Sequence, residues 1–392
     1  MAGPEEYDAY RPPVQGSPLG SASVADSGGA AALSASRATP EATAALTDLH
    51  TRRLRLRRPE SGDEPVWLAL HTDPALYRHA PYARPTRDEA RAGFEAQLSA
   101  WGSDGFGYWI VSDRATGARI GVAGVRPDGP GRLNLYYRLA TAAHGKGLAI
   151  EAARAAVIAA TEWLPCRIEA LVKDSNIASI RTAERAGLDA IGADSRPDDP
   201  LGSGASTRYA APTVARVDRL DDGAREQVLD LWCRVTEAGG SVGFLPGAPR
   251  SRVAASLADH EAQMASGRAF GVGLRTAAGD LVGWAWWVTV ANPLLAHGRW
   301  LYRLMVDPAH QGRNFGALLM AGAHREARAD GAELLQLGYR SGSGLGDFYA
   351  RFGYAEVGRI PGAIRVAAGD DRDDVTMARR ADGAPLRGDG CH

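Results

Sequence analysis

The chain has 392 residues, which is more than one compact core usually organises, so two domains are expected. Its 45 basic and 46 acidic residues give a formal net charge of -1, which provides no excess of positive charge for a phosphate backbone. Nucleic acid is therefore not an expected partner, and no apolar run approaches the ~18 residues that a membrane helix needs.

The cysteines and the first residues of the chain favour a reducing compartment. The three cysteines, Cys166, Cys233 and Cys391, are too few and too scattered for a disulfide framework or a CxxC metal site. The chain starts with acidic residues where a signal peptide would have basic ones, so we expect a soluble cytoplasmic protein. Residues 1–47 are rich in Gly, Ala, Ser and Pro and are expected to form a disordered tail, because ordering them would bury little apolar area.

A first α/β unit is predicted between residues 48 and 195. Leucines and arginines alternate over residues 49–58, which is the pattern of a half-buried strand. Thr86 can cap a helix that presents one apolar face. Three later strands are separated by TG and DGPG turns, so the sheet is expected to begin antiparallel. The predicted elements are a strand at 49–58, helices at 64–71 and 86–101, strands at 108–113, 118–125 and 132–139, a glycine loop and long helix from 144, a strand at 167–172 and a helix at 177–187.

A second unit repeats this order of elements between residues 213 and 381. Residues 196–212 are dense in Gly, Pro, Ser and Asp and predict a linker, and residues 382–392 are expected to be a tail. His144 aligned with Gln311 gives a spacing of 167, which indicates an internal duplication. The predicted elements are a strand at 213–220, helices at 225–236 and 252–266, strands at 269–275, 281–290 and 299–306, a loop and helix at 310–329, a strand at 334–339 and a helix at 346–353.

Each unit has a short loop, glycine-rich in the first copy, that opens its long helix. Free backbone N–H groups and the positive end of the helix dipole converge at such a loop, which favours an anion such as phosphate. Gly145 and Gly147 allow the backbone to approach an anion closely, while Lys146 adds a positive charge that Arg313 supplies in the second copy. An ordinary tight turn would also explain one loop, but the recurrence in both units favours anion binding.

The two loops resemble the acyl-CoA loop of the Gcn5-related N-acetyltransferases, the GNAT family, which runs Gln/Arg-x-x-Gly-x-Gly/Ala. The first copy departs from this pattern at its histidine, and the second has asparagine where the family has glycine. Asparagine is the best non-glycine residue for a positive φ, so the second loop is expected to survive. The resemblance spans about residues 49–380 and implies acyl-CoA binding by His144, Gly145, Lys146, Gly147, Leu148 and Ala149, and by Gln311, Gly312, Arg313, Asn314, Phe315 and Gly316.

The first copy also resembles the ribosomal-protein alanine acetyltransferases, through residues 49–57 and 176–181. This subgroup implies that Asn176 and Ser179 contribute to the acyl-CoA site and that Ser179 can donate a proton to the thiolate. A serine that satisfies the first turn of a helix explains Ser179 equally well. The tandem arrangement is similar to that of GNAT proteins in actinobacterial biosynthetic pathways, including antibiotic pathways. The composition, rich in Arg, Ala and Gly, fits such a source.

The reaction implied by the resemblance is attack by a neutral amine on a thioester, which needs an oxyanion donor and a proton for the thiolate. The implied oxyanion donors are backbone N–H groups near Leu139 and Val306. The implied general acid is Tyr349, which also fits a core aromatic. Its counterpart in the first copy is Ala183, so catalysis is expected in the C-terminal domain. Candidates for a general base by residue type alone are Asp307, Glu237, Asp347 and His297, each of which also fits a solvated surface group.

Three functional hypotheses fit these residues. In the first, the C-terminal domain uses acetyl-CoA to acylate a small-molecule amine. The N-terminal domain then binds a second acyl-CoA, also acetyl-CoA, mainly as a structural ligand. In the second, the N-terminal domain acetylates ribosomal or other protein N-termini, and in the third the chain is a non-catalytic acyl-CoA sensor or scaffold. The implied fold is two tandem α/β GNAT domains, each with a mixed sheet of six or seven strands, splayed in the middle and flanked by helices. Acetyl-CoA and an amine are the expected partners of a monomer or homodimer, without metal, membrane or nucleic acid.

Overall fold

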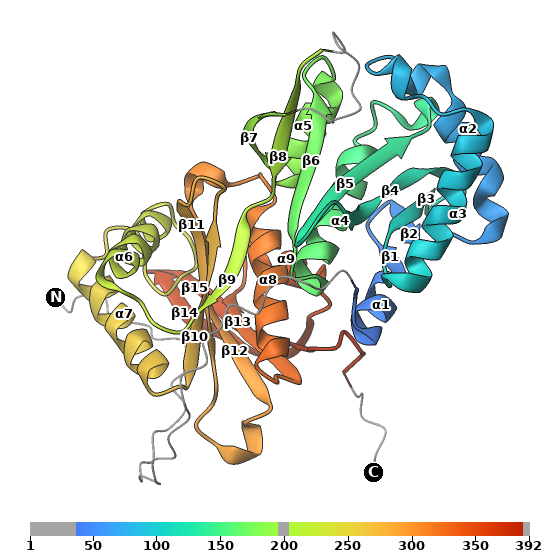
Figure 1. The fold of residues 1–392 in the computed structure, drawn as a ribbon. Coiled ribbons are helices and arrows are strands. Elements are labelled where there is room, and N and C mark those ends of the chain that lie inside the picture. Colours follow the sequence, from blue (N-terminus) through green and yellow to red (C-terminus); the bar gives the residue numbers. More distant parts are fainter. Residues whose placement is uncertain (1–36, 195–203, 387–392) are drawn as a thin grey trace, which may run out of the picture.

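The computed structural model describes residues 37–194 and 204–386. Two mixed β-sheets follow each other along the chain, and helices cover their faces (Figure 1). The strand order is β1-β2-β3-β4-β5-β6-β8-β7 in the first sheet and β14-β15-β13-β12-β11-β10-β9 in the second. The predicted fold class, two α/β units with mixed sheets, is confirmed.

The elements of the N-terminal domain follow the predicted order. Helix α3 begins at Thr86, whose hydroxyl accepts a hydrogen bond from the Glu89 N–H at 3.3 Å, while the Glu89 carboxylate accepts one from the Thr86 N–H at 2.7 Å. This capping box confirms the predicted helix start. The helices and strands are α1 (Pro40–Leu46), β1 (Asp48–His50), β2 (Leu54–Arg57), α2 (Glu64–Thr72), α3 (Arg87–Ser103), β3 (Tyr108–Asp113), β4 (Arg119–Pro127), β5 (Arg132–Leu139), α4 (Leu148–Trp163), β6 (Arg167–Lys173), α5 (Ile177–Ala186), β7 (Asp189–Asp194) and β8 (Ser206–Ala210).

The C-terminal domain repeats this arrangement around a second sheet. Asp221 caps its first long helix by accepting a hydrogen bond from the Ala224 N–H at 2.7 Å. The helices and strands are β9 (Thr213–Val217), α6 (Asp222–Glu237), α7 (Arg250–Ala265), β10 (Ala269–Arg275), β11 (Leu281–Val288), β12 (Gly298–Val306), α8 (Phe315–Ala329), β13 (Leu334–Arg340), α9 (Leu345–Ala350), β14 (Ala355–Ala367) and β15 (Asp370–Arg380).

Residues 49–58, predicted as one strand, form parts of two strands instead. β1 and β2 pair as an antiparallel hairpin, with Leu49 opposite Leu56. The turn between them is held by Glu151 on α4, because the Thr51 hydroxyl and the Arg53 N–H both donate to its Oε1, at 2.6 and 2.8 Å. This contact joins distant parts of the chain, so local alternation could not predict it. The first sheet therefore has eight strands, one more than the six or seven expected.

Parts of the predicted tail and linker also belong to the folded N-terminal domain. Helix α1, expected within the tail, buries Ala42 and Leu46 against the core. Strand β8, expected within the linker, pairs antiparallel with both β6 and β7. Sheet hydrogen bonding overrides its polar composition. The rest of these predictions, over residues 1–36 and 196–203, falls outside the described residues.

Both sheets contain the expected splay between two parallel strands. β5 pairs with β6 only from Arg132 to Asn134, and the remainder of β5 diverges from its neighbour. β12 pairs with β13 only from Gly298 to Leu301. The second splay is accentuated by a bulge in β12, where Arg303 has φ 53°, a left-handed conformation that is uncommon for a side chain of this size.

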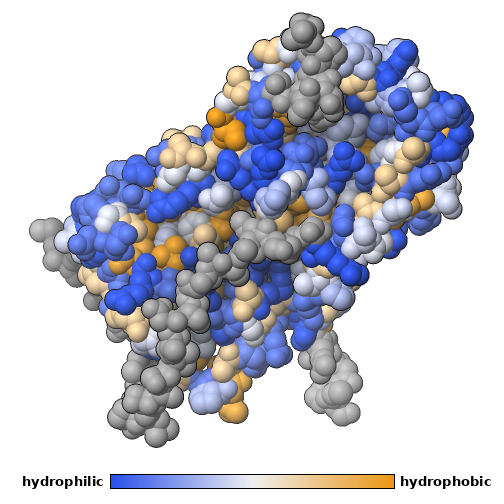
Figure 2. All heavy atoms as spheres, in the orientation of Figure 1, coloured by the Kyte–Doolittle hydropathy of each residue, from blue (hydrophilic) through white to orange (hydrophobic). Residues whose placement is uncertain are grey.

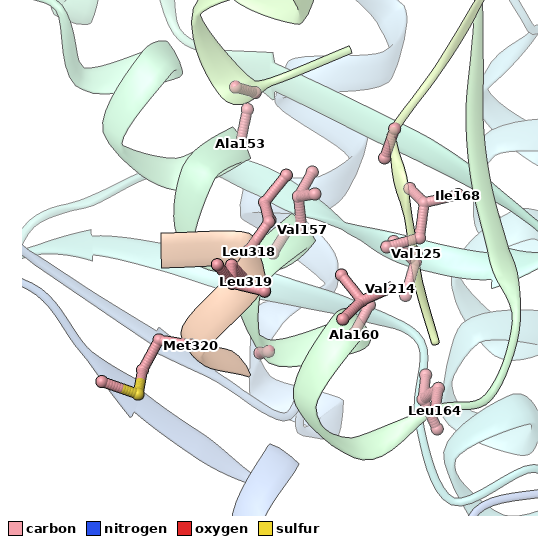
Figure 3. Packing of buried hydrophobic residues seen from close by; sticks show 14 of the residues in the cluster. Val125, Ala153, Val157, Ala160, Leu164, Ile168, Val214, Leu318, Leu319 and Met320 are labelled. Carbon is pink, nitrogen blue, oxygen red and sulfur yellow. The ribbon is translucent and has the colours of Figure 1, made fainter. Parts of the chain in front are cut away.

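The two domains share one apolar core through the packing of α4 on α8. Val157 and Ala160 of α4 lie beside Leu318 and Leu319 of α8, with Val214 alongside (Figure 3). These side chains are buried, and each fully buried aliphatic side chain contributes ~1.5–3 kcal/mol to stability. The interface is therefore part of the fold rather than a contact across a flexible linker.

A buried charged cluster lies at the same interface. Glu162 of α4 faces His324 of α8, with 3.2 Å between Oε1 and Nδ1. The guanidinium groups of Arg328 and Arg379 both lie 3.3 Å from the same carboxylate oxygen. The Tyr354 hydroxyl lies 3.1 Å from the other nitrogen of the histidine ring. One carboxylate of the N-terminal domain is thus the shared counterion of two buried arginines of the C-terminal domain.

Acidification is expected to destabilise the folded chain through this cluster. Burial and the charge of Arg379 lower the pKa of His324 from 6.5 to about 4, so the unfolded chain takes up this proton first and stability falls as the pH drops from 6.5 to about 4. Burial alone would raise the pKa of Glu162, but His324, Arg379 and Arg328 lower it from 4.5 to about 2. Its contribution is therefore lost between pH 4.5 and about 2. Thermal unfolding measured across this range should show a falling Tm.

The matched variant for this prediction is His324→Gln, which cannot take up the proton. Its Tm is expected not to fall between pH 6.5 and about 4, and to fall as in the wild type at lower pH. A Tm that stays constant in the wild type as the pH falls through both ranges would contradict the assignment.

The visible surface is mainly hydrophilic, with apolar residues in small groups (Figure 2). One such group is the loop between β11 and β12, where Leu294 and Leu295 are exposed. Within residues 37–194 and 204–386, no helix is both long and apolar enough to cross a membrane.

Candidate functional site

The loops before α4 and α8 adopt the same backbone conformation. Gly145 and Gly147 have φ 73° and 70°, and Gly312 and Asn314 have φ 78° and 71°. Asn314 thus takes the left-handed conformation that was expected of it, at the helix N-cap where the first copy has glycine. The predicted internal repeat extends to the dihedral angles of the loop.

Each loop presents a run of backbone N–H groups that bond to no acceptor in the described part of the chain. The run covers residues 145–149 in the first copy and residues 312–316 in the second. The residues just before them are engaged, because the N–H of His144 donates to Thr141 and that of Gln311 donates to Pro308. Consecutive free N–H groups at a helix N-terminus form a cradle for an anion. This geometry fits the phosphates of acyl-CoA at both loops.

Side chains around the first loop fix its shape and leave its cation exposed. The His144 ring lies 2.9 Å from the carbonyl oxygen of Leu139, which ties the loop to the end of β5. Arg53 donates to the carbonyl oxygen of Lys146 at 2.8 Å. Lys146 itself is exposed, while Leu148 is buried and Ala149 half-buried as the helix enters the core. The loop is therefore held through its carbonyl groups, and its N–H groups stay available.

Side chains around the second loop engage the N-terminal domain. Arg313 forms an ion pair with Asp189, and the Asn314 side-chain amide donates to the carbonyl oxygen of Ala186 at 3.0 Å. The loop backbone approaches Gly187 so closely that a Cβ there would lie 3.0 Å from the Arg313 carbonyl oxygen. Asparagine thus provides an interdomain hydrogen bond that glycine could not make. Gln311 and Gly312 are exposed, Gly316 is half-buried, and Phe315 is buried and stacks on His310 with ring centroids 5.5 Å apart.

The backbone N–H groups of Leu139 and Val306 point into the two splays. The Ala140 N–H donates to Ile120 and the Asp307 N–H donates to Val282, so these two N–H groups point toward the antiparallel neighbours β4 and β11. Because successive N–H groups of a strand point in opposite directions, those of Leu139 and Val306 face away from β4 and β11. Each strand has already diverged from its parallel neighbour at this point. Both N–H groups therefore lack a partner in the sheet, and their role as oxyanion donors stays a prediction.

Tyr349 of α9 is buried in the C-terminal domain, with 6% of its surface exposed. Its ring lies against Tyr339 and Tyr354, with centroids 5.9 and 6.1 Å apart, and its hydroxyl bonds to no described residue. Burial and the neighbouring Tyr339 raise its pKa, so the phenol carries its proton at neutral pH. This state suits a proton donor, and the environment equally suits a core aromatic.

The N-terminal splay contains a tyrosine that the sequence analysis missed. Tyr137 of β5 crosses to α5, where its hydroxyl lies 2.9 Å from Ser179 Oγ and donates to the Ser179 carbonyl oxygen at 2.9 Å. Burial raises the pKa of Tyr137 to about 12, although the hydrogen bond to Ser179 opposes this effect. The Asn176 side chain caps α5 by accepting from the Ser179 N–H at 3.1 Å. The alternation of residues 132–139 as a strand could have placed Tyr137 here.

A cavity of about 640 Å³ lies beside the splay of the C-terminal sheet. The α6–α7 connection, β12, β13 and the β14–β15 pair form its walls. Lining side chains include Trp300, Tyr302, Arg303, Arg340 and Asp374. Aromatic and apolar walls with a few charged groups are typical of a small-molecule site.

Tyr349 and the cavity lie on opposite faces of the sheet. Tyr349 belongs to the same buried cluster as Leu337 and Val375, on the face that α8 covers. Gly338 and Asp374, which alternate with them along β13 and β15, line the cavity. The splay therefore joins a face that can receive the thioester to a face that can receive its acceptor.

Asp374 is a second residue that the sequence analysis missed. No ion pair or hydrogen bond joins its carboxylate to another residue in the described ranges. Burial raises its pKa above the usual 3.8. Arg340 is opposite Asp374 on β13, and Gly338, two residues before Arg340, has no side chain to fill the space, since a Cβ there would lie 3.8 Å from Asp374 Oδ1. In sequence, Asp374 is one of four acidic residues within 370–374, so local pattern could not single it out.

The base candidates proposed by residue type are all placed elsewhere. Asp307 pairs with Arg234 at 2.8 Å, and Glu237 accepts a hydrogen bond from the Gly247 N–H at 2.9 Å. Asp347 and His297 are exposed. The tryptophans of β11 are buried in the cores on both faces of the sheet, so they do not line the cavity.

Comparisons with known proteins match a family model to each of the two units. Two family models, each described as an acetyltransferase (GNAT) domain, match residues 53–189 and 270–356. No curated protein matches the sequence. The chain is similar to the solved structures of a GNAT-family acetyltransferase from Bordetella pertussis (25% identity, 42% of this chain and 99% of that chain, TM-score 0.36) and an acetyltransferase from Agrobacterium tumefaciens (27%, 42% and 92%, TM-score 0.36). It is also similar to the ribosomal-protein-S18-alanine N-acetyltransferase from Escherichia coli (16%, 46% and 99%, TM-score 0.34).

Proposed function

Because the chain belongs to the GNAT acetyltransferase family, with two domains of that fold, we propose that its C-terminal domain transfers an acetyl group from acetyl-CoA to a small-molecule amine. The observation that carries this proposal is the cavity of about 640 Å³ beside the C-terminal splay, with an uncommitted carboxylate in its wall. A cavity of this size suits a small acceptor rather than a folded protein surface. The N-terminal domain is proposed to bind acetyl-CoA mainly as a structural ligand.

In the proposed reaction, the amine enters from the cavity and its nitrogen attacks the carbonyl carbon of the thioester in the splay. The Val306 N–H, which faces away from β11, is proposed to stabilise the oxyanion that develops on the carbonyl oxygen. Collapse of the tetrahedral intermediate breaks the carbon–sulfur bond, and Tyr349 donates a proton or a hydrogen bond to the departing thiolate. A phenol and a thiol have ordinary pKa values of about 10 and 8.5, so full transfer is uphill and hydrogen bonding provides part of the stabilisation.

Asp374 is the proposed acceptor of the proton that the attacking amine loses. Its raised pKa makes it a better base than an exposed aspartate, and its carboxylate forms no ion pair within the described residues. The reaction needs the neutral amine, and a carboxylate in the cavity wall can also bind the ammonium form before it is deprotonated. Asp374 therefore supports both recognition and activation of the acceptor.

Replacing Asp374 with asparagine is expected to lower kcat/KM for an amine acceptor about 100-fold, because proton removal and ammonium binding are both lost. The acid limb of the pH profile should flatten, since it reports protonation of this carboxylate. The matched control is Asp370→Asn, which removes a carboxylate of the same strand that is paired with Arg372. An unchanged pH profile in the Asp374→Asn variant would remove Asp374 from the mechanism.

Native mass spectrometry with acetyl-CoA tests the binding part of the proposal. Two bound molecules are expected, and Gly147→Glu and Asn314→Glu should each remove one, because each variant places a carboxylate in one anion cradle. A residue with a side chain is also strained at the φ of 70° that Gly147 adopts. Failure of the wild type to bind acetyl-CoA would overturn the proposed function.

The contact between Tyr137 and Ser179 favours a second candidate, catalysis in the N-terminal domain on protein N-termini. Two hydroxyl groups in the splay could pass a proton to the thiolate there. This candidate predicts that Ser179→Ala abolishes turnover while Tyr349→Phe does not. The main proposal predicts the reverse for the same two variants.

A further inference from the structure

The N-terminal domain places two arginines beside the loop of the C-terminal domain. Arg154 of α4 donates to the Arg185 carbonyl oxygen at 2.6 Å and to the Gly312 carbonyl oxygen at 3.0 Å. It thus contacts the loop directly through the Gly312 carbonyl oxygen, while the N–H groups of the loop stay free. Arg185, at the end of α5, is exposed next to it.

A third arginine joins this group from the C-terminal domain. Arg351 follows α9, the helix that carries Tyr349, and its guanidinium lies 5.7 Å from the centre of the Phe348 ring. The Phe348 ring lies against the second loop, since a Cβ at Gly316 would be 3.9 Å from it, so Arg351 flanks the loop that Arg154 contacts. Burial and the positive charges of Arg185 and Arg351 lower the pKa of Arg154.

No carboxylate neutralises these three arginines within the described residues. The acid nearest to the loop, Asp189, is committed to Arg313. Three like charges held together raise the free energy of the fold, and an anion bound among them would lower it. Arginine clusters bind phosphate tightly because the planar guanidinium donates two parallel hydrogen bonds.

Coenzyme A carries a third phosphate in addition to its pyrophosphate. The pyrophosphate is attached to the 5′ position of the ribose and the third phosphate to the 3′ position, so a single sugar separates them. If the free N–H groups of residues 312–316 hold the pyrophosphate, the 3′-phosphate falls within reach of groups that flank the loop.

We propose that Arg154, Arg185 and Arg351 form a site for the 3′-phosphate of the acyl-CoA bound to the C-terminal loop. The inference rests on the proposed function of that domain and extends it, because the N-terminal domain then supplies part of the C-terminal acyl-CoA site. The tandem arrangement thereby has a role in acyl-CoA binding that one isolated GNAT domain could not provide.

The test compares CoA with 3′-dephospho-CoA, which lacks only this phosphate, by isothermal titration calorimetry. The full chain carries Gly147→Glu, so that binding reports the C-terminal loop. In this background, CoA is expected to bind at least about 10-fold more tightly than dephospho-CoA, in keeping with a charge-assisted hydrogen bond. Adding Arg185→Gln or Arg351→Gln should weaken CoA about 10-fold and leave dephospho-CoA unchanged.

Matched variants separate phosphate binding from a structural role. Arg185 forms no side-chain hydrogen bond or ion pair in the described ranges, so its replacement should not alter the Tm. Arg132→Gln is the control, because Arg132 is another arginine of the N-terminal domain, at the far end of β5. Among the described residues, its side chain bonds only to the backbone carbonyl of Asp128. Arg154→Gln should also remove the preference for CoA.

Two results would overturn the inference while leaving the proposed function intact. One is equal affinity for CoA and dephospho-CoA in the Gly147→Glu background. The other is an equal loss of affinity for both ligands in the arginine variants, which would mean that the arginines only position the loop. If the Gly147→Glu chain binds neither ligand, the C-terminal site and the inference both fail.

Discussion

Replacing Glu162 with alanine is expected to lower the free energy of unfolding by about 3–5 kcal/mol. The carboxylate lies between the guanidinium groups of Arg328 and Arg379, each 3.3 Å away, and these side chains are almost fully buried. Without Glu162, two positive charges remain in the interior without a counterion, and this uncompensated charge is the source of the cost. Urea unfolding followed by fluorescence, with the midpoint and slope compared between variants, measures the change.

The control for Glu162 is an ion pair at the surface. Glu356 pairs with Arg359 in an exposed position, and its replacement by alanine should change stability by no more than about 1 kcal/mol. If Glu162→Ala lowers the free energy of unfolding by no more than Glu356→Ala does, water reaches the interdomain cluster. The triple variant Glu162→Leu, Arg328→Met and Arg379→Met should recover much of the stability, because it removes the charges together with their counterion.

Replacing Tyr349 with phenylalanine is expected to lower kcat about 100-fold with little change in KM for the acceptor. The variant keeps the ring contacts with Tyr339 and Tyr354 and removes only the hydroxyl that is proposed to stabilise the thiolate. The loss should depend on the leaving group, so an acyl donor whose thiol has a lower pKa should show a smaller effect. Burial raises the pKa of Tyr349, and the wild-type rate should therefore not fall through its ionisation near pH 10.

The matched control for Tyr349 is Tyr354→Phe, which removes another buried hydroxyl of the same core. That hydroxyl lies 3.1 Å from His324 at the domain interface, so its loss should lower the Tm and leave kcat almost unchanged. A Tyr349→Phe variant with normal kcat and lowered Tm would assign Tyr349 to the core and return attention to Ser179.

Local signals in the sequence were sufficient for both loops and for most of the order of elements, whereas α1, β7, β8, β14 and β15 were not among the predicted elements. The N-cap at Thr86 depends on neighbouring residues and the spacing of 167 between the copies depends on repetition, and the structure contains both the cap and the repeated loop. The left-handed conformation of Asn314 followed from the intrinsic preference of asparagine. The splay followed from the family resemblance and is visible in the short parallel pairing of β5 with β6.

The sequence by itself therefore determined the two GNAT units, the loops that fit acyl-CoA and the difference between Tyr349 and Ala183, because each depends on residues close together in the chain or on a repeated motif. Only the tertiary structure decided that β8 belongs to the first sheet and that Asp374, alone in an acidic stretch, lines a cavity. It also decided that Arg154 reaches the loop of the other domain. These features arise where distant segments meet, and burial, charge compensation and sheet pairing between such segments are set by packing rather than by local pattern.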